Sequence, residues 1–283
     1  MQWWFFIVAA LAGTVGQLID ATTGMGFGAI SSTTLIAAGG STAMVVAAIN
    51  VAKITSGFVS GFTHWKLGNV RTYWLTPLAV TGVVGGITGA LLLTFAPEGL
   101  SQKVTPWLLI FMALLILRRY LLSRREARKR TISGGATSEA TTETIEQPSR
   151  FQRFYMKARQ RTRIGMSAIG FTSGFLNAWT GAYGPFATSA VLLLQTGHPR
   201  YVVGTVNAAE VFVAAAISVT ILIRLGMDQD AWILAGALTL GSLITAPVGA
   251  MLVKRLQAKS LGLFIAIVLI SVNAFTLYKA YLQ

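Results

Sequence analysis

The sequence of 283 residues has no cysteine, only two histidines and few charged residues. Without cysteine, disulfide bonds, thiolate catalysis and cysteine metal sites are excluded. The two histidines, His64 and His198, are too far apart in the sequence to indicate a metal cluster, so no metal and no other cofactor is expected. Only 11% of the residues are charged, whereas soluble proteins carry about 25%. The scarcity of charge excludes a soluble globular domain.

Hydrophobic residues, in contrast, make up 54% of the chain, and the mean hydropathy is +0.64. A membrane-spanning helix needs about 20 largely apolar residues. Ten apolar segments are predicted, covering roughly residues 3–20, 27–39, 43–63, 73–95, 104–122, 164–180, 185–196, 201–223, 231–252 and 260–281. The chain is therefore predicted to be an all-α polytopic membrane protein. The second and seventh segments are short and follow glycine-rich breaks, so each is either a short span or a re-entrant helix.

The positive charge is concentrated in the middle of the chain. Of the 23 basic residues, 13 lie between Arg118 and Arg163, and residues 123–162 are polar and rich in Ser, Thr and Glu. Such a composition predicts a partly disordered linker between two transmembrane halves, 1–122 and 163–283. Most of the net charge of +14 is gathered there, which indicates contact with anionic lipid headgroups and not with nucleic acid. The positive-inside rule places this linker in the cytoplasm and both termini outside.

The two halves match each other at an offset of 157 residues. The pairs include Gly13 and Gly170, Asp20 and Asn177, Gly24 and Gly181, Asn50 and Asn207, and Lys53 and Glu210. With five segments in each half, the second half begins on the opposite side of the membrane from the first. Such an inverted repeat is typical of secondary transporters, whose substrate sites lie near the midplane between the repeats.

Three charged side chains, Asp20, Lys53 and Glu210, lie within apolar segments. Each costs roughly 2.5–3.5 kcal/mol to place in the membrane, so a function is expected. In one interpretation Lys53 attracts an anion, while Glu210 or Asp20 exchanges a proton. In the other, Lys53 and Glu210 form a structural ion pair, and Asp20 caps a helix or lines an aqueous vestibule.

The glycine-rich breaks are a second candidate for the anion site. Where a helix starts within the membrane, its first N–H groups are unsatisfied and carry positive partial charge, which suits an anion. The alternative is close helix packing on glycine. The predicted substrate contacts are Thr23, Gly24, Gly26, Gly28, Asn50, Lys53, Thr180, Gly181, Tyr183, Gly184 and Asn207.

The doubled pattern resembles the TauE/SafE sulfite exporter family. The resemblance rests on the segment Asp20 to Gly28, its counterpart Asn177 to Pro185, the polar stripe that follows each, and the charged central linker. It covers nearly the whole chain apart from residues 123–162. It implies transport of sulfur-containing or organic anions, such as sulfite or sulfonates, across the bacterial inner membrane. The second break has Tyr183 and Pro185 where the first has Gly26 and Gly28, so the two need not hold a substrate alike.

Together these features predict a secondary carrier, acting as an exporter, for a small sulfur-containing anion, with alternating access and proton coupling. A carrier for a carboxylate or another organic anion is the nearest alternative, because helix starts do not distinguish sulfonate from carboxylate. A passive anion channel would use the same residues without saturation or uphill movement. An enzyme is not expected, because the sequence has neither a metal constellation nor a plausible Ser/His pair.

Overall fold

The computed structural model describes residues 3–132, 150–194, 199–252 and 258–282, and this part of the chain forms helices and no strand. The helices are α1 (Trp3–Thr23), α2 (Phe27–Ala37), α3 (Thr42–Lys66), α4 (Thr72–Phe95), α5 (Glu98–Ile132), α6 (Arg150–Thr180), α7 (Gly184–Leu194), α8 (Pro199–Leu225), α9 (Gln229–Leu252) and α10 (Ala258–Leu282).

Six stretches of helix within the described residues are long and apolar enough to cross a membrane. They are Trp3–Ala21, Thr42–Lys66, Thr72–Phe95, Glu98–Arg118, Arg200–Leu225 and Leu263–Leu282. The outward faces of the helices carry exposed large hydrophobic side chains, among them Trp3, Ile7, Val80, Phe111, Ile244 and Ile267. An apolar exterior of this kind requires a lipid environment, and the chain is a multi-pass membrane protein.

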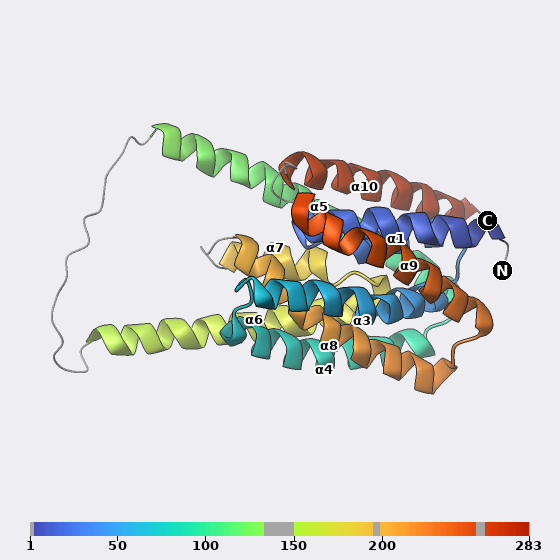
Figure 1. The fold of residues 1–283 in the computed structure, drawn as a ribbon, viewed down its shortest axis with the longest axis horizontal. Coiled ribbons are helices and arrows are strands. Elements are labelled where there is room, and N and C mark those ends of the chain that lie inside the picture. Colours follow the sequence, from blue (N-terminus) through green and yellow to red (C-terminus); the bar gives the residue numbers. More distant parts are fainter. Residues whose placement is uncertain (1–2, 133–149, 195–198, 253–257, 283) are drawn as a thin grey trace.

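The helices α2 and α7 are shorter than the membrane is thick. Each has 11 residues, or about 16 Å at 1.5 Å per residue, against a hydrocarbon core about 30 Å thick. The chain turns back at the first break. Two contacts show this: Gly26 packs against Ile19, and Gly40, after the end of α2, packs against the Phe5 ring at the start of α1. α2 therefore runs antiparallel to α1, and α7 likewise extends back toward the linker end of the molecule (Figure 1).

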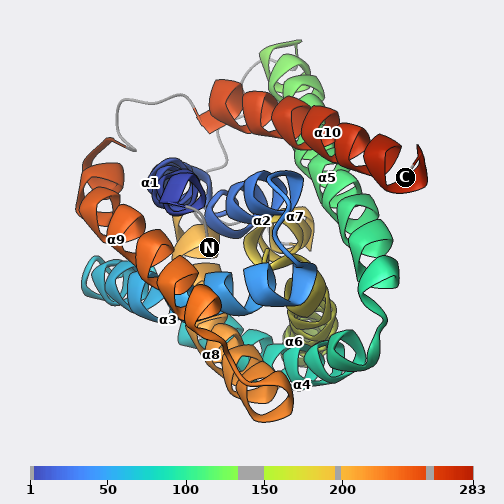
Figure 2. The ribbon, with the colours of Figure 1, turned by 90° about the vertical axis from the view of Figure 1, so that its right-hand side faces the viewer.

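The arrangement places the breaks at the centre of the molecule. Both termini lie at one end, and the linker ends of α5 and α6 lie at the other (Figure 1). Seen from the end with the termini, α2 and α7 occupy the middle and longer helices surround them (Figure 2). The largest helix interfaces are α4 with α6, α1 with α9, α3 with α8, α4 with α8, and α5 with α10. Each joins the first half of the chain to the second, so the core is built by both halves together.

The helices α5 and α6 continue into the segment predicted as linker. α5 ends at Ile132 and α6 begins at Arg150, so the predicted boundaries at 122 and 163 are not helix ends. The added turns are rich in Arg and Lys, which favour helix in water as well as in lipid. Residues 133–149 lie outside the described residues. The side chains of the basic linker ends, and therefore the lipid contacts predicted for them, also lie outside the described part of the structure.

Candidate functional site

The two breaks have the same backbone geometry at equivalent positions. Gly24, after α1, has φ +69°, and Gly181, after α6, has φ +67°. The Gly24 N–H donates to the carbonyl of Asp20 and the Gly181 N–H to that of Asn177, both at 2.7 Å. A left-handed residue with such a bond ends a helix, and glycine adopts this conformation without strain. The sequence match between the breaks is therefore a match of conformation.

The breaks also pack directly against each other. A Cβ atom on Gly28 would collide with the carbonyl of Gly181, and one on Gly184 would collide with the carbonyl of Gly24. The backbones thus approach as closely as glycine allows, as the interpretation based on packing requires. These glycines determine how the halves meet, whatever else the breaks bind.

Each short helix is connected to the opposite break by one hydroxyl group. Ser32 of α2 donates from Oγ to the carbonyl of Thr180. Thr188 of α7 donates from Oγ1 to the carbonyl of Gly24 at 3.0 Å. Carbonyls at a helix end lack partners within the helix, and these hydroxyls satisfy one at each break.

Beside the first break lies a buried group of three ionisable residues, which we call the central charge cluster: Asp20, Lys53 and Glu210. Lys53 Nζ lies 2.7 Å from Asp20 Oδ2 and 3.1 Å from Glu210 Oε2. All three residues are at most 3% exposed. Two carboxylates share one ammonium, so the cluster carries a formal charge of −1 when every member is ionised. Lys53 and Glu210 are therefore in contact, and Asp20 completes the group.

Asp20 also caps the start of α2. Its Oδ1 accepts the N–H of Gly26 at 2.9 Å and lies 3.5 Å from the N of Phe27. A carboxylate at this position satisfies unpaired N–H groups and favours the positive end of the helix. The capping role considered for Asp20 thus holds together with its ion pair. The α2 start already holds an anionic group, which is the chain's own.

The second short helix begins near the other carboxylate. The Glu210 carboxylate lies near the backbone N–H of Tyr183, just before α7. Its Oε2 atom has Lys53 as an ionic partner. Each short helix therefore starts beside one carboxylate of the central charge cluster.

Two buried asparagines extend the polar region. Asn50 donates from Nδ2 to the carbonyl of Val46 at 2.9 Å, and its Oδ1 accepts from Asn177 at 3.0 Å. Asn207 donates to Ser60 at 3.4 Å, and its Oδ1 has no hydrogen-bond partner among the described residues. Both predicted amides are buried, and each is held by the half of the chain opposite to its own.

The predicted hydroxyl donors of the breaks are directed at helix carbonyls. Thr23 donates to the carbonyl of Ile19 at 2.9 Å and Thr180 to that of Leu176 at 2.7 Å. The hydroxyl of Tyr183, fully buried, donates to the carbonyl of Leu78 at 3.3 Å. The structure therefore groups Lys53 with the two carboxylates, and these three hydroxyls donate to helix carbonyls.

Sequence reasoning overlooked two polar residues near the site. Asn177, which bonds Asn50, is the repeat counterpart of Asp20, and that match could have identified it. Gln17 is 1% exposed, and neither atom of its amide has a partner among the described residues. It lies three residues before Asp20, on the same face of α1, and this spacing is a signal that the sequence contains.

No group of three His, Asp or Glu side chains within the described part of the chain could hold a metal ion. The site is thus an ionic and amide cluster at the junction of two broken helices.

Comparison with known proteins agrees with this architecture. Residues 9–276 match the model of a family described as sulfite exporter TauE/SafE. A probable membrane transporter protein, YtnM, of Bacillus subtilis (strain 168) is 29% identical over 280 residues, which cover 98% of this chain and 84% of the relative. No solved structure matches the chain. The family consists of membrane transporters and not of enzymes, and the match spans both breaks and the central charge cluster. The chain belongs to the TauE/SafE sulfite exporter family.

Proposed function

We propose that the protein is a secondary transporter of a small sulfur-containing anion, such as sulfite or an organosulfonate, in the bacterial inner membrane. The observation that carries the proposal is the central charge cluster at the start of both short helices. Buried ionisable residues in a membrane protein mark substrate or proton pathways by default. The family supports sulfur anions as the substrate class.

Alternating access would work between two inverted repeats of five helices each. The helix packing supports this arrangement: α1 contacts α9 as α6 contacts α4, and α3–α8 and α5–α10 each pair a helix with its own counterpart. The termini and the linker ends also lie at opposite ends of the molecule (Figure 1). An inverted repeat predicts both features, and it places the substrate between the halves.

In this proposal the anion exchanges places with a carboxylate. Lys53 and the start of α2 are both occupied by Asp20, so an anion gains these contacts only when Asp20 or Glu210 withdraws. Lys53, the break N–H groups and the amides of Asn50 and Asn207 would then hold it. The same groups that stabilise the described conformation thus become the substrate site.

Charge balance couples this exchange to a proton. The cluster has a formal charge of −1 and repels an anion in a medium of low dielectric constant. A proton on Glu210 or Asp20 brings the charge to zero and removes this repulsion. Proton and anion therefore favour each other's binding and travel in the same direction. Because the proton cancels the charge of a singly charged anion, the membrane potential does not contribute, and outward movement of the anion is driven by its own concentration gradient.

The test is flux of labelled sulfite and sulfonates into proteoliposomes, with and without an imposed proton gradient. Saturable uptake that accumulates under the gradient is expected. A variant with a neutral cluster, Asp20→Asn with Lys53→Met and Glu210→Gln, should be silent, whereas Glu98→Gln, outside the cluster, should transport normally.

Two results would overturn parts of the proposal. Flux without saturation or uphill movement would indicate a passive anion channel. Transport of carboxylates with silence across the sulfur anions would keep the architecture and discard the substrate class.

A further inference from the structure

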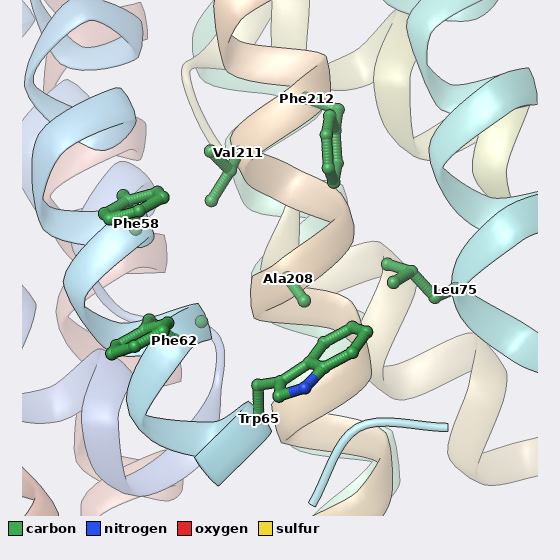
Figure 3. Close-up of a pocket in the computed structure, with 9 residues that line it drawn as sticks. Phe58, Phe62, Trp65, Leu75, Ala208, Val211 and Phe212 are labelled. Atoms are coloured by element: carbon green, nitrogen blue, oxygen red, sulfur yellow. The ribbon is translucent and has the colours of Figure 1, made fainter. Parts of the chain in front are cut away.

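An apolar groove opens on the side of the molecule between α3 and α8, with α4 at its end. It holds about 180 Å³. The residues that form its walls include Phe58, Phe62, Trp65, Leu75, Ala208 and Phe212. Figure 3 shows the three α3 aromatic side chains on one wall, Phe212 on the other, and the Trp65 indole reaching across toward Leu75. Phe58, Phe62, Trp65 and Phe212 are all more than half exposed, so the groove is open to lipid along its length.

The end of the groove at Trp65 is basic. Lys66 Nζ lies 4.7 Å from the centroid of the Phe62 ring. The guanidinium carbons of Arg71 and Arg200 lie 3.9 Å and 4.7 Å from the centroid of the Tyr201 ring. The surrounding stretches of sequence, 60–80 and 195–209, contain no acidic residue. Three cations thus lie at one end of an apolar groove without a nearby carboxylate from their own segments.

These cations and the groove belong to one continuous surface. Arg71 begins α4, one turn before Leu75, and its N–H donates to Thr205 Oγ1 at 2.9 Å. Thr205 lies one turn before Ala208 on α8. The basic end and the apolar walls are therefore held by the same three helices.

We propose that this groove is a binding site for an anionic phospholipid. One acyl chain lies along the aromatic walls, and the phosphate contacts Lys66, Arg71 and Arg200. Basic residues beside a membrane favour anionic over neutral headgroups by about fivefold each, while the long apolar stems of such side chains lie against the acyl region. A neutral phospholipid fits the walls equally well and gains nothing from the cations.

One residue of the groove, Gly57, lies one helical turn after Lys53 of the central charge cluster. Gly57 forms part of the groove floor, and a Cβ atom there would lie 3.0 Å from Val211 Cγ2 and 3.7 Å from Lys53 Cγ. An acyl chain in the groove therefore bridges α3 and α8, the two helices that bring Lys53 and Glu210 together. Bound lipid is expected to stabilise this pair.

Trp65 provides a local reporter for the test. The purified protein is placed in two kinds of phosphatidylcholine vesicle. One contains brominated phosphatidylglycerol and the other contains the same fraction of brominated phosphatidylcholine. The quenching of tryptophan fluorescence is measured in both. The other lipid-facing tryptophans respond to both lipids. We expect excess quenching by brominated phosphatidylglycerol that disappears in Trp65→Phe.

Two variants separate the headgroup from the groove. Lys66→Gln with Arg71→Gln and Arg200→Gln should abolish the excess, whereas the matched variant Lys103→Gln with Arg224→Gln and Lys279→Gln, which removes three cations packed on aromatic rings elsewhere, should retain it. Ala208→Leu fills the groove without a change of charge and should also abolish it.

Equal quenching by the two lipids, or an excess that survives Trp65→Phe, would overturn the proposal. So would an excess that survives in both the basic-end variant and Ala208→Leu. None of these readouts depends on transport, so they remain informative if the proposed function fails.

Discussion

Lys53 is the residue on which the other two members of the central charge cluster depend. Its ammonium contacts both Asp20 and Glu210, and all three side chains are removed from water. A buried charge is tolerated only with its partners in place, and loss of one partner leaves the others uncompensated. The same residue that the sequence assigns to anion binding is therefore also needed for stability.

We predict that Lys53→Met lowers the free energy of unfolding by about 3–5 kcal/mol, because it leaves two buried carboxylates without a counter-charge. The variant that also carries Asp20→Asn and Glu210→Gln should recover most of the loss, since no buried charge remains. Thermal unfolding in detergent is the measurement. Lys103→Met, at an exposed position, serves as the control. If Lys53→Met had the same melting temperature as the wild type, the prediction would be contradicted.

Proton coupling is also tested at single residues. Wild-type transport should rise as the pH falls, because protonation of Glu210 or Asp20 removes the negative charge that opposes the anion. With Glu210→Gln the cluster is neutral at every pH, so the rate should no longer depend on pH. Initial rates in proteoliposomes at a series of pH values measure this. Asp20→Asn is compared in the same way, and pH dependence that persists in both variants would refute coupling at the cluster.

At the scale of elements, the two breaks contact each other directly through their backbones. Gly28 meets the Gly181 carbonyl and Gly184 meets the Gly24 carbonyl, with no room for a methyl group. Helices without hydrophobic attraction between them associate in lipid through such close contacts and through hydrogen bonds. The hydroxyls of Ser32 and Thr188 provide those bonds at this junction.

Gly28→Ala should push the two breaks apart and lower the free energy of unfolding by about 1–3 kcal/mol, the usual cost of overpacking. Gly236→Ala is a matched control on α9, where an added Cβ meets nothing within 4 Å. It should stabilise the helix by up to about 1 kcal/mol. Melting temperatures of the two variants should therefore shift in opposite directions, and equal shifts would show that the close contact does not matter.

At the scale of the whole molecule, the halves are interleaved. The largest interfaces all join one half to the other, and the cluster takes Asp20 and Lys53 from the first half and Glu210 from the second. The absence of cysteine makes the proposed inversion directly testable, because any introduced thiol is unique.

Leu67 and Leu225 each precede a glycine of positive φ, Gly68 and Gly226, at equivalent turns of the two halves. The inverted repeat predicts that these turns face opposite sides of the membrane. A membrane-impermeant maleimide should label Leu225→Cys in intact cells but label Leu67→Cys only after permeabilisation. Labelling of both from the same side would rule out the inversion.

Much of this fold could be predicted from the sequence, since hydropathy and glycine breaks locate ten helices within a few residues. The helices α5 and α6 extend beyond their predicted apolar segments, because helix-forming charged residues continue them. The presence of Asp20, Lys53 and Glu210 in the membrane could be read from the sequence, and a pair of Lys53 with Glu210 was one of two interpretations. That Asp20 shares the same ammonium was not predicted, because it depends on how α1 packs beside α3. The hydroxyls of Thr23, Thr180 and Tyr183 stay predicted substrate contacts. That each donates to a helix carbonyl in the structure could not be predicted, because a sequence does not show which acceptor is nearest.

The interleaving of the halves has a consequence for biosynthesis. Glu210 follows Lys53 by 157 residues, an interval of roughly 10–30 s at a synthesis rate of about 5–20 residues per second. During that time Asp20 is the one cluster partner that Lys53 has, and Gly28 has no opposite break to meet. The centre of the transporter is thus completed only after most of the second half has been made. A chain interrupted at the linker would expose the polar groups of the first break and the cluster to the membrane, and quality-control proteases can recognise such a chain.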